Sequence, residues 1–267
     1  MDATFSEFSY GFAVTREIAS GRFGSLTGAP VFPSQYREGR TGGGYDVNLP
    51  VQGIPLFLQF KLSHCLVRSS ASEWHKFGHP YYRMYLRPLR HSNQHALLTD
   101  LQNQGNSVYY VAPRFHTVEE LNEAYGNGDI LERSAFFPPA SISLGNPPDI
   151  DVHYMAFHPS GKPHFLCSQQ PKETKEGYTG KEVAEIERIR VKDRRSKVDE
   201  IFFEGIADAV LDVLTERSAN TGRAKDLQSR LNQRNAPFRE AAEFAAYLTR
   251  VFLDAELFVV GESNSIV

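Results

Sequence analysis

An almost continuously apolar segment, Ile54 to Leu62, limits the folds open to this chain of 267 residues. Its length and the turn residues before it predict a buried β-strand, with side chains alternating between two faces. Leu56, Leu58, Phe60 and Leu62 share one face, and Phe57, Gln59 and Lys61 share the other. An ammonium group in a buried strand is unfavourable unless it is paired. We therefore expect a carboxylate beside Lys61.

The residues before this strand predict its partner. Tyr45 to Leu49 alternates apolar and polar side chains after a run of three glycines, and Gly53 and Pro55 are typical of a turn. We expect a β-hairpin in which Asp46 faces the side that carries Gln59 and Lys61. Asp46 is then the natural carboxylate for Lys61.

An acid at Asp46, followed about a dozen residues later by Gln59-x-Lys61 at the end of an apolar strand, resembles a nuclease active site. The motif is that of the restriction-endonuclease-like superfamily, the PD-(D/E)xK nucleases, and Gln in place of the second acid is similar to the Mrr branch. The resemblance implies an α/β fold, with a mixed sheet flanked by helices. The alternative is an edge strand whose Lys61 side chain extends to water.

The same resemblance implies a metal site. Asp46, Gln59 and the backbone carbonyl of Phe60 would bind Mg²⁺, with Mn²⁺ as an alternative, and Lys61 would hold the attacking water. Gln59 is neutral, so a working site needs another acid. Without one, the fold would be catalytically silent.

The first 19 residues supply a candidate for that acid. Residues 3 to 19 predict an opening helix, which we expect to be anchored by Phe5, Phe8 and Phe12. Glu17 shares a side with Tyr10, Ala13 and Val14, and we expect it to face a cleft beside the hairpin. Glu38, in a Gly- and Pro-rich loop, is the reserve candidate. A solvated Glu17 paired with a neighbouring arginine is the alternative.

Downstream segments complete the expected core. Residues 81 to 88 alternate and predict a third strand, on which Arg83 and its neighbouring tyrosines would contact phosphates and bases, or else make cross-strand pairs. Residues 92 to 104 predict a helix, and residues 107 to 113 predict a strand. By resemblance, that helix packs over the site, where Gln94 or His95 would orient substrate.

A change in composition near Gln170 divides the chain into a nuclease domain, residues 1 to 170, and a helical C-terminal region, residues 171 to 267. Residues 197 to 217 and 238 to 253 predict amphipathic helices, which either pack on each other or offer a surface to a protein partner or a second copy. Four arginines in this region are expected to contact DNA phosphates, namely Arg188, Arg190, Arg194 and Arg195. A solvated face with acidic neighbours is the alternative for them.

Composition excludes several classes of protein. The net charge of −3 argues against a protein that coats nucleic acid, and the two cysteines have no metal-ligand spacing. The N-terminus lacks the pattern of a signal peptide, and no apolar run approaches the roughly 20 residues that span a bilayer. We therefore expect a cytoplasmic protein with no membrane contact.

The function expected from these features is Mg²⁺-dependent endonucleolytic cleavage of DNA. The family resemblance suggests a role in restriction or antiphage defence. The first alternative is a catalytically inactive nuclease-like subunit that binds proteins or nucleic acid. The second is an unrelated small-molecule enzyme, although the chain has no phosphate-binding loop and no G-x-S-x-G motif.

Overall fold

The structure is a computed structural model that describes residues 1–21, 25–26, 52–87, 93–144, 153–167, 171–174, 176–218 and 241–261. The helices of this part of the chain are α1 (Glu7–Ala19), α2 (Trp74–Phe77), α3 (Gln94–Asn103), α4 (Val118–Asn127), the short 3₁₀ helix η2 (Pro139–Ser141), α5 (Gly180–Arg194), α6 (Glu200–Ser218) and α8 (Ala241–Leu253). The strands are β1 (Ser25–Leu26), β2 (Gln52–Phe60), β3 (Ser63–Leu66), β4 (Tyr81–Leu86), β5 (Ser107–Pro113), β6 (Ser134–Phe137), β7 (His153–His158), β8 (Gly161–Cys167), β9 (Pro171–Thr174), β10 (Tyr178–Thr179), β11 (Ser196–Lys197) and β12 (Glu256–Gly261).

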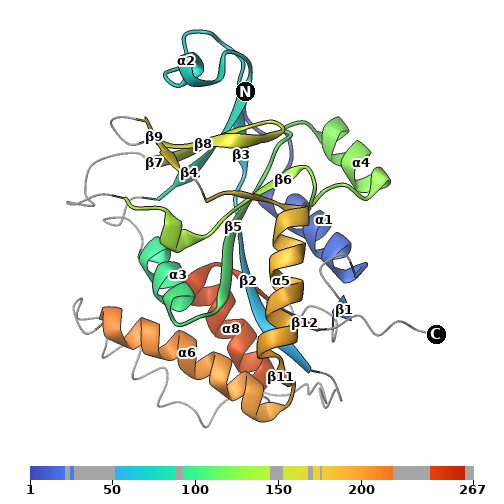
Figure 1. Ribbon diagram of the computed structural model, residues 1–267, viewed down its shortest axis with the longest axis vertical. Helices are drawn as coiled ribbons and strands as arrows, with labels where there is room; N and C mark the ends of the chain where they lie inside the picture. Colours follow the sequence, from blue (N-terminus) through green and yellow to red (C-terminus); the bar gives the residue numbers. More distant parts are fainter. Residues whose placement is uncertain are drawn as a thin grey trace.

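These strands form two sheets, and the expected mixed α/β fold is confirmed. The first sheet has seven strands in the order β1-β12-β2-β5-β6-β10, with β11 also paired to β2. Among the strand pairs of this sheet in the described residues, only β2 and β5 are parallel. The second sheet is antiparallel, in the order β3-β4-β7-β8-β9. It lies beyond the upper end of β2 and β5 (Figure 1).

Alternation along β2 places helices on both faces of the first sheet. Phe57 belongs to a cluster of buried side chains that includes residues of α3, α6 and α8. Leu56, Leu58 and Phe60 belong to a second cluster with residues of α1, α4 and α5. The two-faced pattern predicted for this strand is confirmed. We call these the α3/α8 face and the α1/α5 face.

The opening helix is confirmed as α1, but its buried side differs from the expected one. Phe8 and Phe12 are 74% and 58% exposed, so they do not anchor the helix. Tyr10, Val14 and Ile18 are fully buried instead. They follow an i, i+4, i+8 spacing, which lines one side of a helix. Glu17 lies on this inward side, with 5% of its surface exposed.

The turn predicted within residues 53 to 55 is wrong. Gly53 and Pro55 lie inside β2, where they pair with Gly261 and Val259 of β12. Proline has no N–H to donate to a neighbouring strand. It is tolerated here because pairing with β5 begins only at Leu56, so Pro55 has a paired strand on one side alone. From Leu56 to Leu58, β2 has β12 on one side and β5 on the other. The expected partner strand, residues 45 to 49, lies outside the described residues.

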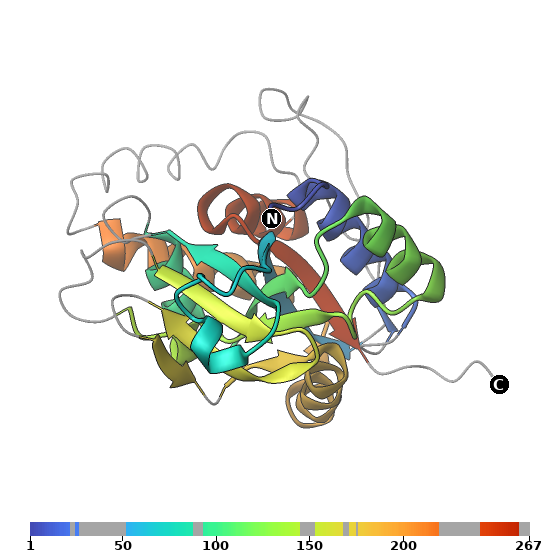
Figure 2. The same cartoon turned by 90° about the horizontal axis from the view of Figure 1, so that it is seen from above.

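The C-terminal region is helical, as expected, but it also contributes strands to the first sheet. Strands β10, β11 and β12 all follow residue 171, and β12 is a direct neighbour of β2. Helices α6 and α8 pack on each other, and their apolar residues join the core on the α3/α8 face (Figures 1 and 2). The two expected domains therefore share one sheet and one core. Their division at residue 170 stays a prediction.

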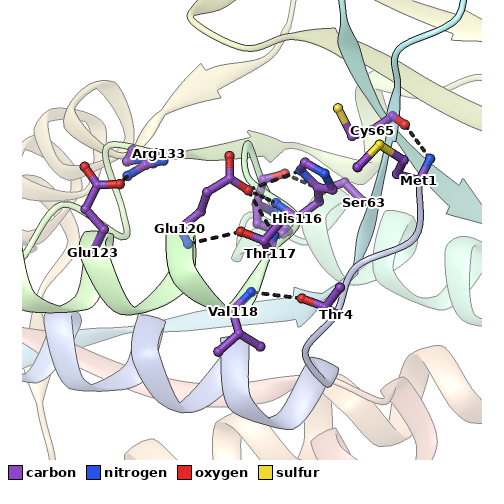
Figure 3. A network of polar contacts seen from close by, with 11 residues as sticks. Met1, Thr4, Ser63, Cys65, His116, Thr117, Val118, Glu120, Glu123 and Arg133 are labelled. Atoms are coloured by element: carbon purple, nitrogen blue, oxygen red, sulfur yellow. Dashed lines mark hydrogen bonds and ion pairs between the residues drawn. The ribbon is translucent and has the colours of Figure 1, made fainter.

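Polar contacts tie the residues before α1 to neighbouring elements (Figure 3). The amino group of Met1 donates to the Cys65 carbonyl oxygen of β3 at 2.6 Å. The Val118 N–H at the start of α4 donates to Thr4 Oγ1 at 2.9 Å. Glu120 closes a capping box at the start of α4 with Thr117. The first two contacts hold the segment that leads into α1 beside β3 and α4.

None of the helices in the described ranges is long and apolar enough to cross a lipid bilayer.

Candidate active site

The C-terminal end of β2 carries Gln59 and Lys61 toward the α3/α8 face. The Lys61 N–H donates to the Val111 carbonyl oxygen at 2.9 Å, so backbone pairing with β5 continues one residue beyond β2. Only 1% of Gln59 and 8% of Lys61 is exposed. A buried polar pair of this kind requires hydrogen-bond partners.

Gln94, the first residue of α3, supplies partners to both side chains. Lys61 Nζ donates to Gln94 Oε1 at 3.2 Å, and Gln94 Nε2 donates to Gln59 Oε1 at 2.6 Å. Gln59 Nε2 donates in turn to the Phe60 carbonyl oxygen at 3.0 Å. The expected position of Gln94 over Gln59 and Lys61 is therefore met in the structure.

The turn between α8 and β12 completes this cluster. Gln94 Nε2 lies 3.1 Å from the Leu253 carbonyl oxygen and 3.1 Å from Asp254 Oδ2. Strand β12 runs antiparallel to β2 with Glu256 opposite Leu58, which brings the preceding turn beside the end of β2. We call Gln59, Lys61, Gln94, Leu253 and Asp254 the β2-end cluster.

Asp254 adopts a left-handed backbone conformation, with φ of 51°, and is the only non-glycine residue with positive φ in the described chain. Such a conformation is costly for most L-residues, and Asp and Asn tolerate it best. Strained residues of this kind concentrate at functional sites. The conformation directs the Leu253 carbonyl and the Asp254 carboxylate to the same nitrogen atom.

Charged groups around the cluster act on Lys61. Burial lowers the pKa of Lys61, the charges of Glu7 and Asp254 oppose this effect, and Arg87 adds to it. Glu7 lies in the first turn of α1 and is an exposed residue. Partial burial of its carboxyl group nevertheless raises its pKa, and the charge of Lys61 opposes this change. The charges of two carboxylates and of Arg87 thus act on the buried Lys61.

The acids expected from the sequence lie elsewhere or are not described. Asp46 and Glu38 both fall outside the described residues. The structure does not bring Glu17 to the β2-end cluster, because the buried side of α1 packs on the opposite face of the sheet. Glu17 Oε2 accepts a hydrogen bond from the Leu131 N–H at 3.1 Å instead. Ten residues of helix, or about 15 Å, separate Glu17 from Glu7.

The expected phosphate-binding arginines also lie apart from the cluster. Arg83 belongs to β4 of the second sheet, where it lies 3.5 Å from Glu73 Oε2 and stacks over Tyr154 at 4.1 Å. This agrees with the alternative of local pairing. Arg87, which follows β4, is the arginine of that segment whose charge acts on Lys61.

The basic residues of α5 lie toward the other end of the sheet. Arg190 donates to Ser107 Oγ at 2.9 Å, at the start of β5, and Arg194 donates to the Gly105 carbonyl oxygen at 3.4 Å. Arg188 pairs with Glu185, and Arg195 caps the helix. Because β2 and β5 are parallel, the start of β5 lies several residues, roughly 15 Å, from the level of Lys61. Their contact with DNA stays a prediction.

His95 is held inside the core and does not face the β2-end cluster. Its ring nitrogens lie 3.1 Å from Tyr110 Oη and 2.9 Å from the Ile142 carbonyl oxygen. Burial lowers its pKa. Within the described part of the chain, no three His, Cys, Asp or Glu side chains gather as a metal-binding group.

Asp254 and Glu7 are the residues that sequence reasoning missed. The run Leu257 to Val260 is apolar and contains an aromatic and two β-branched residues, which is the signal for a strand that carries Asp254 into the sheet. Glu7 had no comparable signal. Comparison of the chain with protein-family models, with curated proteins and with solved structures finds no match.

Proposed function

We propose that this protein is a divalent-metal-dependent endonuclease that hydrolyses phosphodiester bonds in DNA. The observation that carries the proposal is the buried Lys61, two residues after Gln59 at the end of β2, with the carboxylates of Asp254 and Glu7 acting on it. A buried ammonium with a lowered pKa beside acids in one cluster is typical of catalytic sites. Arg87 and Lys61 together provide the positive charge that attracts a phosphate group.

The donor atoms of the cluster fit a hard divalent cation such as Mg²⁺ or Mn²⁺. Oxygen atoms of an amide, a backbone carbonyl and a carboxylate converge from Gln59, Leu253 and Asp254. Such a cation takes oxygen ligands, and when bound it polarises a phosphate oxygen and lowers the pKa of bound water. Asp46, which the motif resemblance assigns to the same cation, would add a further carboxylate.

Lys61 has two roles in this proposal. Its ammonium group orients the water that attacks phosphorus, and it offsets the negative charge that develops on the phosphate oxygens in the transition state. Burial strengthens the second role, because charge interactions are larger where water is excluded. In the structure, this ammonium group donates a hydrogen bond to Gln94 Oε1 at 3.2 Å.

Plasmid nicking by the purified protein tests the proposal. Supercoiled plasmid incubated with the wild-type protein and Mg²⁺ or Mn²⁺ is expected to become relaxed and then linear, and EDTA is expected to prevent this. The same protein without added metal is the control. Intact plasmid under all these conditions, from protein shown to be folded, would reject the nuclease function.

One observation favours the alternative of an inactive binding module. The side chains of Gln59, Lys61 and Gln94 satisfy one another, as a structural network does. A module of this kind would retard DNA or a protein partner in a binding assay without nicking the plasmid. The nicking experiment therefore separates the two functions.

A further inference from the structure

Three oxygen atoms from two separate parts of the chain surround the amide nitrogen of Gln94. Gln59 Oε1 lies 2.6 Å from Gln94 Nε2, and the Leu253 carbonyl oxygen and Asp254 Oδ2 each lie 3.1 Å from it. The oxygens represent three ligand types, an amide, a backbone carbonyl and a carboxylate. This donor set is one that Ca²⁺, Mg²⁺ and Mn²⁺ accept.

The orientation of the Gln94 amide follows from its neighbours. Lys61 Nζ can only donate, so the atom that faces it at 3.2 Å is Oε1. The Leu253 carbonyl and the Asp254 carboxylate can only accept, so the atom that faces them is Nε2. Both sides of the amide therefore fix the same orientation.

More oxygen atoms than hydrogen atoms meet at the Gln94 amide nitrogen. An amide nitrogen carries two hydrogen atoms, and three oxygens lie within hydrogen-bond distance of Gln94 Nε2. At most two of the contacts are therefore full hydrogen bonds. A cation at the same position interacts with all three oxygens at once.

Backbone features also favour positive charge at this position. Leu253 is the last residue of α8, so its carbonyl oxygen belongs to the negative end of the helix dipole. The left-handed conformation of Asp254 aims its carboxylate at the same point as this carbonyl. A left-handed residue commonly ends a helix, and here the following Ala255 N–H donates to the Thr249 carbonyl oxygen at 3.3 Å. The same turn brings two acceptors to one nitrogen atom.

We propose that Gln59 Oε1, the Leu253 carbonyl and the Asp254 carboxylate form a divalent-cation site, which the Gln94 amide occupies when no cation is bound. The carboxylate of this site comes from the C-terminal segment. Cation binding at this site does not depend on the nuclease function. The catalytic role of the bound cation does rest on that proposed function. It makes Gln94 a gating residue, because its nitrogen must leave before the cation enters.

The exchange has a consequence for Lys61. If Gln94 turned its oxygen to the cation, its Nε2 would face Lys61 Nζ, and two donors would oppose each other. Cation entry therefore breaks the hydrogen bond between Lys61 and Gln94. Lys61 is held by Gln94 in the cation-free protein and becomes available to substrate only when the cation is present.

Cation binding in the absence of DNA tests the site. We expect isothermal titration of the full-length protein with Mn²⁺, Mg²⁺ and Ca²⁺ to show one site on the wild type. Asp254→Asn keeps a residue that tolerates positive φ but removes the charge, and it should weaken binding by at least roughly tenfold. Glu119→Gln, which neutralises an exposed acid of α4, is the matched control and should bind as the wild type does.

Substitution of Gln94 tests the gate. Gln94→Ala removes the competing amide, so the cation no longer has to break the hydrogen bonds of that amide. We therefore expect cation affinity to rise by about tenfold. Gln94→Glu places a carboxylate among three acceptors, so its thermal unfolding midpoint should rise with added Mn²⁺ by more than that of the wild type. The second variant keeps the test valid if Gln94→Ala fails to fold.

The outcomes separate this site from the nuclease function. Unchanged affinity in Asp254→Asn overturns the site, and unchanged or weaker affinity in Gln94→Ala together with a wild-type response in Gln94→Glu overturns the gate. Cation binding that follows these expectations without plasmid nicking supports the site and rejects the nuclease. Nicking by Asp254→Asn at the wild-type rate and Mg²⁺ dependence rejects the site and leaves the nuclease standing.

Discussion

Lys61 and Gln94, from a strand end and a helix start 33 residues apart, are joined by a hydrogen bond of 3.2 Å between Nζ and Oε1. The buried ammonium group therefore has a neutral amide as its direct partner. The carboxylate of Asp254 accepts a hydrogen bond from the nitrogen atom of the same Gln94 amide, so Gln94 lies between Lys61 and Asp254. This relationship gives the β2-end cluster an arrangement in which one amide contacts every other member.

Replacing Lys61 by an apolar residue of similar length should not unfold the protein. For Lys61→Met we expect a free energy of unfolding within about 1 kcal/mol of wild type, because losing a desolvated charge offsets the hydrogen bond to Gln94. Leu58→Ala, a matched core change on the same strand, should lose about 2–5 kcal/mol. Urea denaturation at pH 7 measures both, and a loss in Lys61→Met as large as that of Leu58→Ala would contradict the account.

The pH dependence of that comparison has a definite sign. The pKa of Lys61 is lower in the folded protein than in the unfolded chain, because burial disfavours the charged form. The folded state therefore binds this proton more weakly, and wild-type stability should rise as pH increases through the folded pKa toward 10.5. Lys61→Met should lack this rise.

The backbone of Asp254 makes a separate prediction about stability. Asp254→Ala and Asp254→Gly both remove the contact with Gln94, so their difference isolates the effect of positive φ. We expect the glycine variant to be more stable than the alanine variant by about 1 kcal/mol. Thermal or urea unfolding of the pair measures this difference. Equal stabilities would show that the turn relaxes to an ordinary conformation.

Glu17 and Glu7 should respond differently to the same chemical change. Glu17→Gln should lower the free energy of unfolding by about 1–2 kcal/mol, because a buried carboxylate accepts the Leu131 N–H, and should leave the Mg²⁺ dependence of cleavage unchanged. Glu7→Gln removes a charge that acts on Lys61 and should raise the Mg²⁺ concentration needed for half-maximal cleavage. Metal titrations of both variants decide the matter, and the reverse pattern would place the second acid at Glu17.

His164 should make the protein sensitive to acid. The side chain is 1% exposed and packs edge-on against Phe137, and burial, with a smaller contribution from Arg114, lowers its pKa from 6.5 to about 4. Stability from the neutral ring is fully present above pH 6.5 and is lost as pH falls toward 4, by roughly 3 kcal/mol at most. His164→Leu should flatten the unfolding free energy over this range. An equally steep decline in the variant would assign acid sensitivity to other groups.

Local patterns in the sequence predicted much of the fold. The apolar run of β2 and the alternation of β4 indicated strands. These signals are local, because they depend on spacing within one segment. The opening helix was also predicted, but its inward side was assigned to Phe8 and Phe12, because aromatic residues suggested the core more strongly than the spacing of Tyr10, Val14 and Ile18 did.

Long-range pairing could not be predicted in the same way. Strand β12 pairs with β2 although the two strands lie far apart in the sequence. No local pattern specifies which strand becomes the neighbour of another. Gln94 was a candidate only through the resemblance, and Asp254 was not a candidate at all. The polar residues of β2 indicated that a carboxylate must lie nearby, but not which part of the chain would supply it.

The rate of plasmid nicking by Lys61→Ala, compared with wild type at saturating Mg²⁺, tests the central claim most directly. Lys172→Ala, which changes an exposed lysine of β9, is the matched control. The account predicts that wild type and Lys172→Ala nick the plasmid at similar rates, while folded Lys61→Ala loses at least about a hundredfold. A folded Lys61→Ala protein that nicks at the wild-type rate would contradict the proposed active site.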